Sequence, residues 1–430
     1  MSAVRAAVGR TFLSLHVRNY RLYFTGQVIS VSGTWMQTVA QAYLVLSVLH
    51  GNGVAMGVTT ALQFVPMLLL ASWGGLVADR VDKRRLLFVT QGSAAVLALA
   101  LAVLTLTRVV ELWQVYLLAS LLGVVNLFDN PARQTFVSEM VPRELLPNAV
   151  SLNSVVMNSA RVIGPAIGGV LIFTVGVADC FFVNAASYAA VIVALALMVP
   201  AELHRSPRVA RAKGQVREGL RYVWSTPGLR DPLLLMTVVG IFAFNFTTTL
   251  PLLAHFTYHG GAGVYGAMSA AMGTGAVIGG LLVAHRSRPS VRLLTVIGLA
   301  FGVMIMVVAL VPSIALTLVA LVPMGACSIA FIATSNATLQ MTSEPSMRGR
   351  VMALYATAFL GTTPIGAPLV GAVSDAFNPR VALGLGAVAT LVASALLAWR
   401  YLGAAAPGRR ARLTGPTGEG DADIAGTAAA

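Results

Sequence analysis

The sequence predicts an all-α integral membrane protein with twelve transmembrane helices in two pseudo-symmetric six-helix bundles. Three observations predict this fold class: an apolar composition, twelve apolar runs of membrane-spanning length, and basic residues that gather in alternate loops. Of the 430 residues, 57% are hydrophobic and 10% are charged, whereas a soluble domain usually carries about 25% charged residues. A surface so poor in charge suits lipid rather than water, which excludes a soluble enzyme.

Each apolar run is about 20 residues long, the length that a helix needs to cross a bilayer. The first six runs lie at 22–48, 54–78, 86–107, 112–128, 150–175 and 177–199. The second six lie at 233–257, 263–284, 291–311, 313–337, 350–374 and 380–402. Polar and apolar residues do not alternate within the runs, so the pattern favours helices over the strands of a membrane barrel.

The net charge of +14 is distributed over the loops and does not indicate a nucleic-acid partner. If the amino terminus lies inside, 26 of the 29 Lys and Arg residues fall in segments on the cytoplasmic side. Basic residues are enriched in the cytoplasmic loops of membrane proteins. The distribution therefore predicts an even number of spans with both termini in the cytoplasm.

A polar stretch at 200–232 separates an amino-terminal bundle, 1–199, from a carboxyl-terminal bundle, 233–402. Within this stretch, Val216–Trp224 has apolar and basic side chains on opposite helical faces, which predicts a cytoplasmic helix on the membrane surface. A plain solvated linker is the alternative. Residues 403–430 are rich in Ala, Gly and Arg and then carry acidic residues, which predicts a disordered cytoplasmic tail.

The two bundles are weakly repeated in sequence. Gly74–Arg80 ends the second span and Gly279–Arg286 ends the eighth in a similar way, at the same predicted membrane face. At a constant offset of 202 residues, Gly164 in the fifth span matches Gly366 in the eleventh. Duplicated halves with a site between them near the bilayer midplane are a transporter architecture.

A glycine, an aspartate and arginines surround the predicted loop between spans two and three. The sequence Gly75-x-x-x-Asp79-Arg80-x-Asp82-Lys83-Arg84 resembles the signature of the major facilitator superfamily, which normally has glycine at the position of Asp82. A small residue permits close helix approach, and a carboxylate at a helix end can cap a neighbouring helix and pair with arginine. We expect a gate that joins the halves, with a simple topological anchor as the alternative. The predicted gating residues are Gly75, Asp79, Arg80, Arg84, Asp129, Arg133, Gly164 and Pro165.

Further motifs resemble the enterobactin-exporter and macrolide-efflux branch of that superfamily and together span residues 18–375. They are Arg18–Phe24, Gly33–Gln37, Asp129–Gln134, Asn158–Pro165 and Arg348–Val351. The resemblance implies the major facilitator fold and a monomeric exporter of the plasma (inner) membrane. It also implies alternating access, protons as candidate coupling ions, and a small amphipathic cargo of the drug, macrolide or siderophore type. An importer or a lipid flippase of the same fold stays an alternative.

The glycine-proline segment Gly164–Gly169 resembles the efflux-associated motif of the superfamily. Proline removes a helix hydrogen bond and the glycines permit a close helix crossing, so the segment is predicted to be a hinge or a seal. Ordinary tight packing is the alternative. Drug/proton antiporters often carry an arginine in span four, and the predicted span four, 112–128, has none.

Arg161 is the basic residue that the pattern places deep within a span. Ionisable groups there are costly and usually functional, and no carboxylate is predicted at its depth, so we expect either cargo recognition or a structural role. No acid is clearly central, which leaves Asp129 and His255 as candidate proton carriers. The predicted substrate-binding residues are Arg161, Gln37, Gln41, Asn158, Asn245 and Asn336.

Other function classes lack their sequence signals. A phosphate loop would end in Gly-Lys, but Lys83 follows Asp82 and Lys213 follows Ala212. Cys180 and Cys327 lie in different halves without a metal-ligand spacing, so no metal or cofactor is predicted. A membrane-embedded enzyme, a remote alternative, would need a His/Asp or Ser/His/Asp cluster at one depth, and none is evident.

Overall fold

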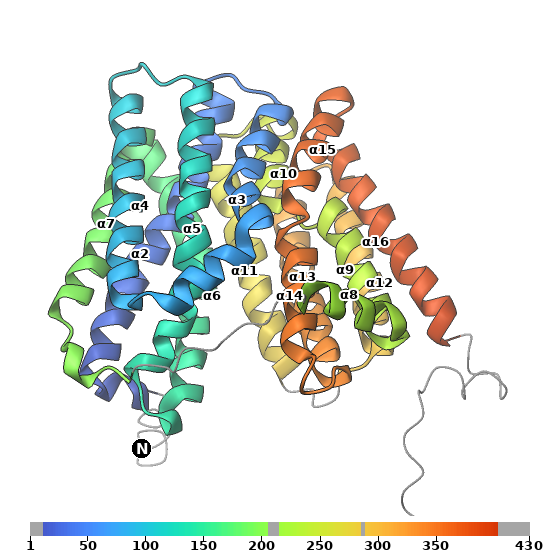
Figure 1. Cartoon of the computed structure of the whole chain (residues 1–430). Helices are drawn as coiled ribbons and strands as arrows, with labels where there is room; N and C mark the ends of the chain where they lie inside the picture. Colours follow the sequence, from blue (N-terminus) through green and yellow to red (C-terminus); the bar gives the residue numbers. More distant parts are fainter. Residues whose placement is uncertain (1–11, 205–214, 285–288, 403–430) are drawn as a thin grey trace, which may run out of the picture.

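A computed structural model of the protein describes residues 12–204, 215–284 and 289–402. These residues form helices and connecting turns, with no strand among them. Figure 1 shows two helical bundles side by side, with the two ends of the described chain at the same face of the molecule. We call this face the terminal face and the opposite one the distal face.

The first bundle holds six membrane-length segments. They are α2 (Arg18–Tyr43) continued by the π-helical turn η2 (Leu44–Val48), α3 (Gly53–Arg80), α4 (Lys83–Leu106), α5 (Leu112–Met140), α6 (Leu146–Thr174) and α7 (Val177–Leu197). Helix α2 packs against α6 and α7, while α5 packs between α3 and α4. Short turns η1 (Leu13–His16), η3 (Arg143–Leu145) and η4 (Pro200–Glu202) lie outside these helices.

The second bundle repeats this count with two interrupted segments. Its members are α9 (Pro227–Phe242) with α10 (Phe246–Leu252) and η5 (Leu253–Thr257), α11 (Ala262–Ala284), α12 (Val291–Leu310), α13 (Ile314–Thr342), α14 (Arg348–Leu360) with α15 (Thr363–Ala376), and α16 (Pro379–Leu402). Its core is aromatic: the ring of Phe244 lies 5.3 Å from that of Phe301 and 5.4 Å from that of Phe359.

The predicted fold class is confirmed, although hydropathy by itself finds eleven spans in the described residues. The segment it leaves out is α2 with η2, whose 31 residues are long enough to cross a bilayer at about 1.5 Å per residue. Helix α2 carries many polar side chains and buries several of them inside the first bundle, among them Gln27, Ser30, Gln37 and Gln41. Its polar residues face protein rather than lipid, which lowers the hydropathy of a true span.

The end of span four differs most from the sequence prediction. Span four was expected to end at residue 128, but α5 continues through Pro131 to Met140. Asp129 and Arg133 are therefore within the helix and not in a loop. The two side chains form an ion pair, so their charges neutralise each other. A paired charge can lie within a membrane span, and the span therefore does not need to end before Asp129. Span four thus contains the arginine that the predicted boundary excluded.

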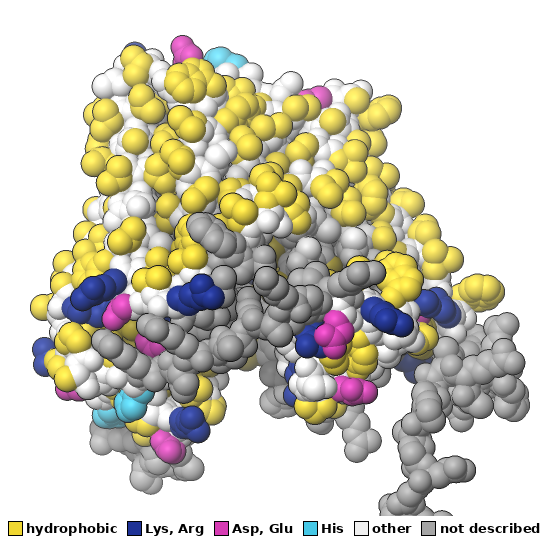
Figure 2. All heavy atoms as spheres, viewed as in Figure 1, with side chains coloured by type: hydrophobic (Ala, Val, Ile, Leu, Met, Phe, Trp, Pro, Cys, Tyr) yellow, Lys and Arg dark blue, Asp and Glu magenta, His cyan; other side chains and the backbone are white. Residues whose placement is uncertain are grey.

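The segment α8 (Gln215–Ser225) covers the predicted surface helix and packs on the terminal end of α14. Glu218 and Arg350 form an ion pair across this contact at 2.7 Å, and Val223 is buried. Leu220 and Trp224 are exposed. Figure 2 shows a broad hydrophobic band over the helices and charged side chains that gather towards the terminal face.

The bundles meet along two helix pairs, α3 with α15 and α6 with α11. Glycines permit the close crossings. A Cβ atom on Gly57 of α3 would overlap the backbone of Ala367, and one on Gly266 of α11 would lie 2.7 Å from the carbonyl oxygen of Pro165. Any larger side chain at either position would push the two bundles apart.

Hydrogen bonds between the bundles lie towards the distal face among the described residues. They join Ser47 with His255, Thr60 with Thr248, and Gly53 and Val54 with Asp375. The last contact is a helix cap, because the Gly53 and Val54 amides at the start of α3 donate to the two Asp375 carboxylate oxygens at 2.6 and 2.8 Å. The distal ends of the two bundles are thereby tied together.

Candidate functional site

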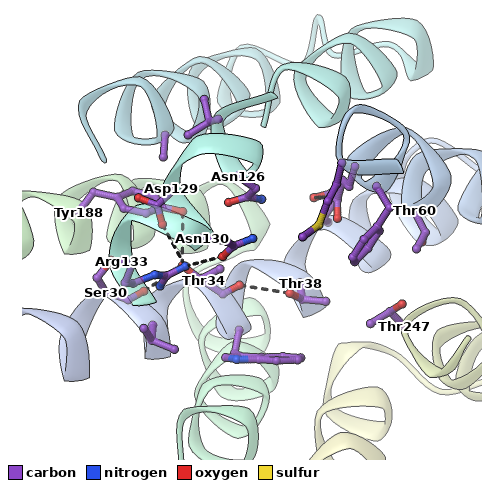
Figure 3. A pocket seen from close by; sticks show the side chains of 18 of the residues that line it. Ser30, Thr34, Thr38, Thr60, Asn126, Asp129, Asn130, Arg133, Tyr188 and Thr247 are labelled. Carbon is purple, nitrogen blue, oxygen red and sulfur yellow. Dashed lines mark hydrogen bonds and ion pairs between the residues drawn. The ribbon is translucent and has the colours of Figure 1, made fainter. Parts of the chain in front are cut away.

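A cavity of about 270 Å³ lies deeper than the distal contacts, mainly against the first bundle. Helices α2, α3, α4, α5, α6 and α7 contribute to its wall, and Thr247 is the lining residue from the second bundle among those described. Figure 3 shows polar side chains from several of these helices converging on it. A concave space with a few placed polar groups is the usual form of a small-molecule site.

A buried carboxylate forms the polar centre of the wall. Asp129 is 2% exposed. Its Oδ1 accepts hydrogen bonds from Thr90 Oγ1 at 2.8 Å and Gln91 Nε2 at 2.7 Å, while its Oδ2 lies 3.0 Å from Nη2 of Arg133. Arg133 Nη2 also donates to Asn130 Oδ1 at 3.0 Å, as Figure 3 shows. The charge is thus fully partnered, as burial requires.

The local sequence explains this arrangement. Asp129 and Arg133 are four residues apart on α5, which places them on the same helical face. Thr90 and Gln91 lie on α4, which packs against α5. Asp129 lies 11 residues before Met140, or about 16 Å from the terminal end of α5 at 1.5 Å per residue. The ion pair is therefore deep in the span.

A polar stripe on α2 forms a second part of the wall. Ser30, Thr34, Thr38 and Gln41 recur at spacings of three or four residues, so they share one face of the helix. All four line the cavity. Gln63 of α3 donates from Nε2 to Oε1 of Gln41 at 3.1 Å, which fixes the amide groups of two helices at the cavity.

Trp35 also lines the cavity, and Arg161 of α6 lies against its ring. The Cζ atom of Arg161 is 5.0 Å from the ring centroid. The Nε atom of Arg161 is buried and has no hydrogen-bond partner. Arg161 is in the middle of α6 (Leu146–Thr174), at the depth that the sequence predicted, but it does not itself line the cavity.

The structure brings one of the six predicted substrate-binding residues, Gln41, into the cavity wall. Gln37 is buried within the first bundle, where its Oε1 accepts from Asn184 at 2.5 Å. Asn158 donates to the Ser154 carbonyl oxygen of its own helix, and Asn336 accepts from Gln340 on α13.

Asn245 is buried at the break between α9 and α10 and donates to the Ile241 carbonyl oxygen at 2.7 Å. Its Oδ1 has no partner among the described atoms. Asn245 is therefore placed to stabilise the interrupted span.

The predicted gating residues whose side chains the structure describes lie apart from one another in this conformation. Arg84 donates to the Leu195 carbonyl oxygen at 2.8 Å, inside the first bundle, and Arg80 is exposed. Asp129 and Arg133 belong to the cavity wall. The side chains of Gly75 and Asp79 lie outside the described residues.

Gly164 and Pro165 occupy two different helix crossings. A Cβ atom on Gly164 would lie 2.6 Å from Cβ of Trp35, so this glycine permits the contact between α6 and α2. The Pro165 carbonyl faces Gly266 of α11, so the proline lies at the boundary between the two bundles. The segment thus touches both the cavity wall and the interface.

Several wall residues were not predicted from the sequence. They are Thr34, Trp35, Thr38, Gln63, Gln91 and Tyr188. The polar stripe on α2 could have been predicted from the sequence, because its polar residues recur at helical spacing in an otherwise apolar run. Gln63, Gln91 and Tyr188 come from three different spans, and no sequence pattern marks the direction in which they point. No group of three or more His, Cys, Asp or Glu residues in the described part of the chain could hold a metal ion.

Comparisons with known proteins agree with this architecture. A family model described as transmembrane secretion effector matches residues 10–406. The chain is 26% identical to the staphyloferrin A transporter of Staphylococcus aureus over 61% of its length and 66% of that protein. It is 28% identical to the multidrug efflux pump Tap of Mycolicibacterium fortuitum, over 80% of this chain and 86% of the pump.

The chain is also 27% identical to the enterobactin exporter EntS of Shigella flexneri, over 87% of both chains. Among solved structures, a bacterial homologue of the human lysosomal transporter Spinster superposes with a TM-score of 0.69 at 13% identity. That match covers 88% of this chain and 95% of the other, and at this identity it concerns the fold.

Proposed function

Because the chain belongs to the transmembrane secretion effector family of major facilitator transporters, we propose that it exports a small amphipathic molecule by alternating access. Its relatives and its fold are those of transporters and not of enzymes. The observation that carries the proposal is the polar cavity beside the interface of the two bundles. Relatives named as efflux pumps and exporters support the outward direction.

We place the protein in the plasma (inner) membrane as a monomer, with the terminal face in the cytoplasm. The concentration of Lys and Arg in the loops of that face supports this orientation. The hydrogen bonds between Gly53, Val54 and Asp375 then lie at the outer surface, which supports assigning this conformation to a state closed towards the outside.

We further propose that protons drive transport and that Asp129 carries them. This carboxylate is buried in the cavity wall and paired with Arg133. A proton bound at Asp129 would remove the negative charge that faces Arg133 and leave the guanidinium with its contacts to Asn130 and Gln27. Cargo occupancy and proton occupancy would thereby influence the same polar network.

We propose that the chain divides into two bundles, 1–199 and 233–402, joined by the linker 200–232, and that these bundles move relative to each other during transport. Closing the terminal face requires the bundles to rotate about the α3–α15 and α6–α11 crossings. Asp79 and the arginines near it are the groups proposed to meet the second bundle in that alternative state. Gly164 and Pro165, at two crossings, are proposed to keep the bundles close during the movement.

Transport by purified protein in proteoliposomes tests the proposal. Erythromycin and a catecholate siderophore would serve as radiolabelled probes, with an imposed pH gradient and protein of known orientation. We expect movement from the terminal to the distal side that requires the gradient. Uptake in the opposite direction would indicate an importer, and movement of fluorescent phospholipid in place of both probes would indicate a flippase. Either result would overturn the export proposal.

A further inference from the structure

The indole ring of Trp35 lines the cavity and packs against the partly buried positive charge of Arg161. Trp35 lines the cavity, whereas Arg161 does not. The guanidinium carbon of Arg161 is nevertheless 5.0 Å from the Trp35 ring centroid, which is within cation–π range. The ring is therefore part of the cavity wall and contacts a cation that does not itself line the cavity.

No carboxylate in the described part of the chain pairs with Arg161. No described residue forms an ion pair or a hydrogen bond with it, and its Nε atom is buried without a partner. Asp129, the buried acid of the cavity wall, already binds Arg133, Thr90 and Gln91. Arg161 consequently contributes a positive charge beside this part of the wall that the described carboxylates do not pair with.

A cation against one face of an indole ring draws electron density towards that face. The ring surface that lines the cavity then becomes a better partner for electron-rich groups and a poorer one for cations. Aromatic rings prefer offset stacking at centroid separations of about 4.5–7 Å, and a planar group in the cavity can adopt this geometry against Trp35.

The hydroxyl groups beside Trp35 also favour a particular kind of cargo, one that donates hydrogen bonds. Thr34 Oγ1 donates to the Ser30 carbonyl oxygen at 3.0 Å, and Thr38 Oγ1 donates to the Thr34 carbonyl oxygen at 3.2 Å. Both threonines line the cavity. With its proton committed to α2, Thr38 Oγ1 can accept hydrogen bonds from a cargo that carries O–H or N–H groups. Thr34 Oγ1 also lies 3.4 Å from the Tyr188 hydroxyl oxygen and keeps one lone pair for the same purpose.

We propose that Trp35, with Arg161 behind it, is a stacking subsite for a planar, electron-rich or anionic aromatic portion of the cargo. The proposal rests on the function proposed above, in which this cavity receives the cargo. It names a substrate class, aromatic rings bearing hydroxyl or acidic groups, and assigns Arg161 an indirect role as a positioning and polarising residue.

Two probes with the same ring system and opposite charge test this subsite. They are 1-pyrenesulfonate and 1-pyrenemethylammonium, bound to the full-length protein in nanodiscs of zwitterionic lipid and followed by fluorescence anisotropy. We expect the sulfonate to bind about 10-fold more tightly, since cation–π effects correspond to roughly 2- to 30-fold in affinity. Protein-free nanodiscs report the partitioning of each probe into lipid.

Four variants separate recognition from structure. Trp35→Leu should weaken both probes, whereas Trp35→Phe should keep the preference for the sulfonate. Arg161→Met should remove the preference by weakening the sulfonate about 10-fold, and Arg161→Lys should restore most of it because the charge is kept. Trp113→Leu is the matched control, since Trp113 is exposed at the distal end of α5 and should change nothing.

Equal affinity of the wild type for the two probes would overturn the subsite. So would a preference that persists in Arg161→Met. If Arg161→Met does not fold, Trp35→Phe and Arg161→Lys still decide, because loss of the preference in both folded variants contradicts the proposal. Failure of the proposed function would look different: the probe preference would be present while no cargo is exported in proteoliposomes.

Discussion

The Asp375 carboxylate is expected to hold the distal ends of the bundles together, and Asp375→Asn should loosen them. The amides of Gly53 and Val54 donate to it at 2.6 and 2.8 Å from across the interface. Hydrogen bonds to a charged group contribute about 1.5–3 kcal/mol each, and a negative charge at a helix amino terminus adds about 0.3–1 kcal/mol. Asp375 is exposed, and water and salt reduce these contributions.

The net contribution should therefore be about 1–2 kcal/mol, or roughly 5- to 30-fold in the ratio of distally closed to distally open protein, because 1.4 kcal/mol is a factor of about ten. Asparagine keeps one acceptor oxygen and no charge, so Asp375→Asn should reach the lower part of this range. Asp375→Ala removes both acceptors and should reach the upper part.

Spin labels across the distal face provide the assay. After Cys180 and Cys327 are replaced by serine, labels at Val175 and Leu310 report the separation of the bundles, since both positions are exposed and lie on different bundles. Pulsed electron–electron double resonance in nanodiscs should show mainly short distances between the two spin labels in the parent protein. Each Asp375 variant should add a population at longer distance in the proportion given above.

Glu111 supplies a matched control. It is also a distal carboxylate at a helix start, but it caps α5 of its own bundle, so Glu111→Gln should leave the distance distribution unchanged. If Asp375→Ala, folded and with an unchanged melting temperature, shifts the ratio by less than twofold, the assignment of Asp375 as a tie between the bundles is wrong.

Three further predictions follow from the described contacts. Asp129→Asn should lower transport driven by a pH gradient at least 10-fold while exchange of cargo without a gradient continues in proteoliposomes; loss of both activities would point to a folding or binding role instead. Lys83→Met should destabilise the protein by about 1–3 kcal/mol in a denaturation assay, because it removes the ammonium group that pairs with the buried Glu139 carboxylate, and adding Glu139→Met should recover much of that loss if the pair is the cause. Single cysteines at Asn52 or Gly260 should react with an impermeant maleimide from outside whole cells and one at Ser206 should not, whereas the reverse pattern would invert the proposed orientation.

The sequence by itself determined the fold class, and it predicted twelve spans and a division into two halves. A helix in lipid must satisfy its own backbone hydrogen bonds and present about 20 apolar residues to the bilayer. Local composition is therefore enough to predict these features. Even α2, which hydropathy misses, is recognised in sequence because its polar residues interrupt a run of the correct length. Basic residues gather in every second loop, and this distribution predicts an even number of spans.

Only the tertiary structure decided which polar residues meet. Nothing in the pattern shows that α5 continues past Asp129, because a charge inside a span is tolerated only when its partners, Arg133, Thr90 and Gln91, are in place. The capping of α3 by Asp375 joins residues more than 300 positions apart, and the contact of Arg161 with Trp35 joins two different helices. Such contacts depend on how each helix is rotated about its axis, and that rotation is set by packing between segments rather than by the residues next to each group in the chain.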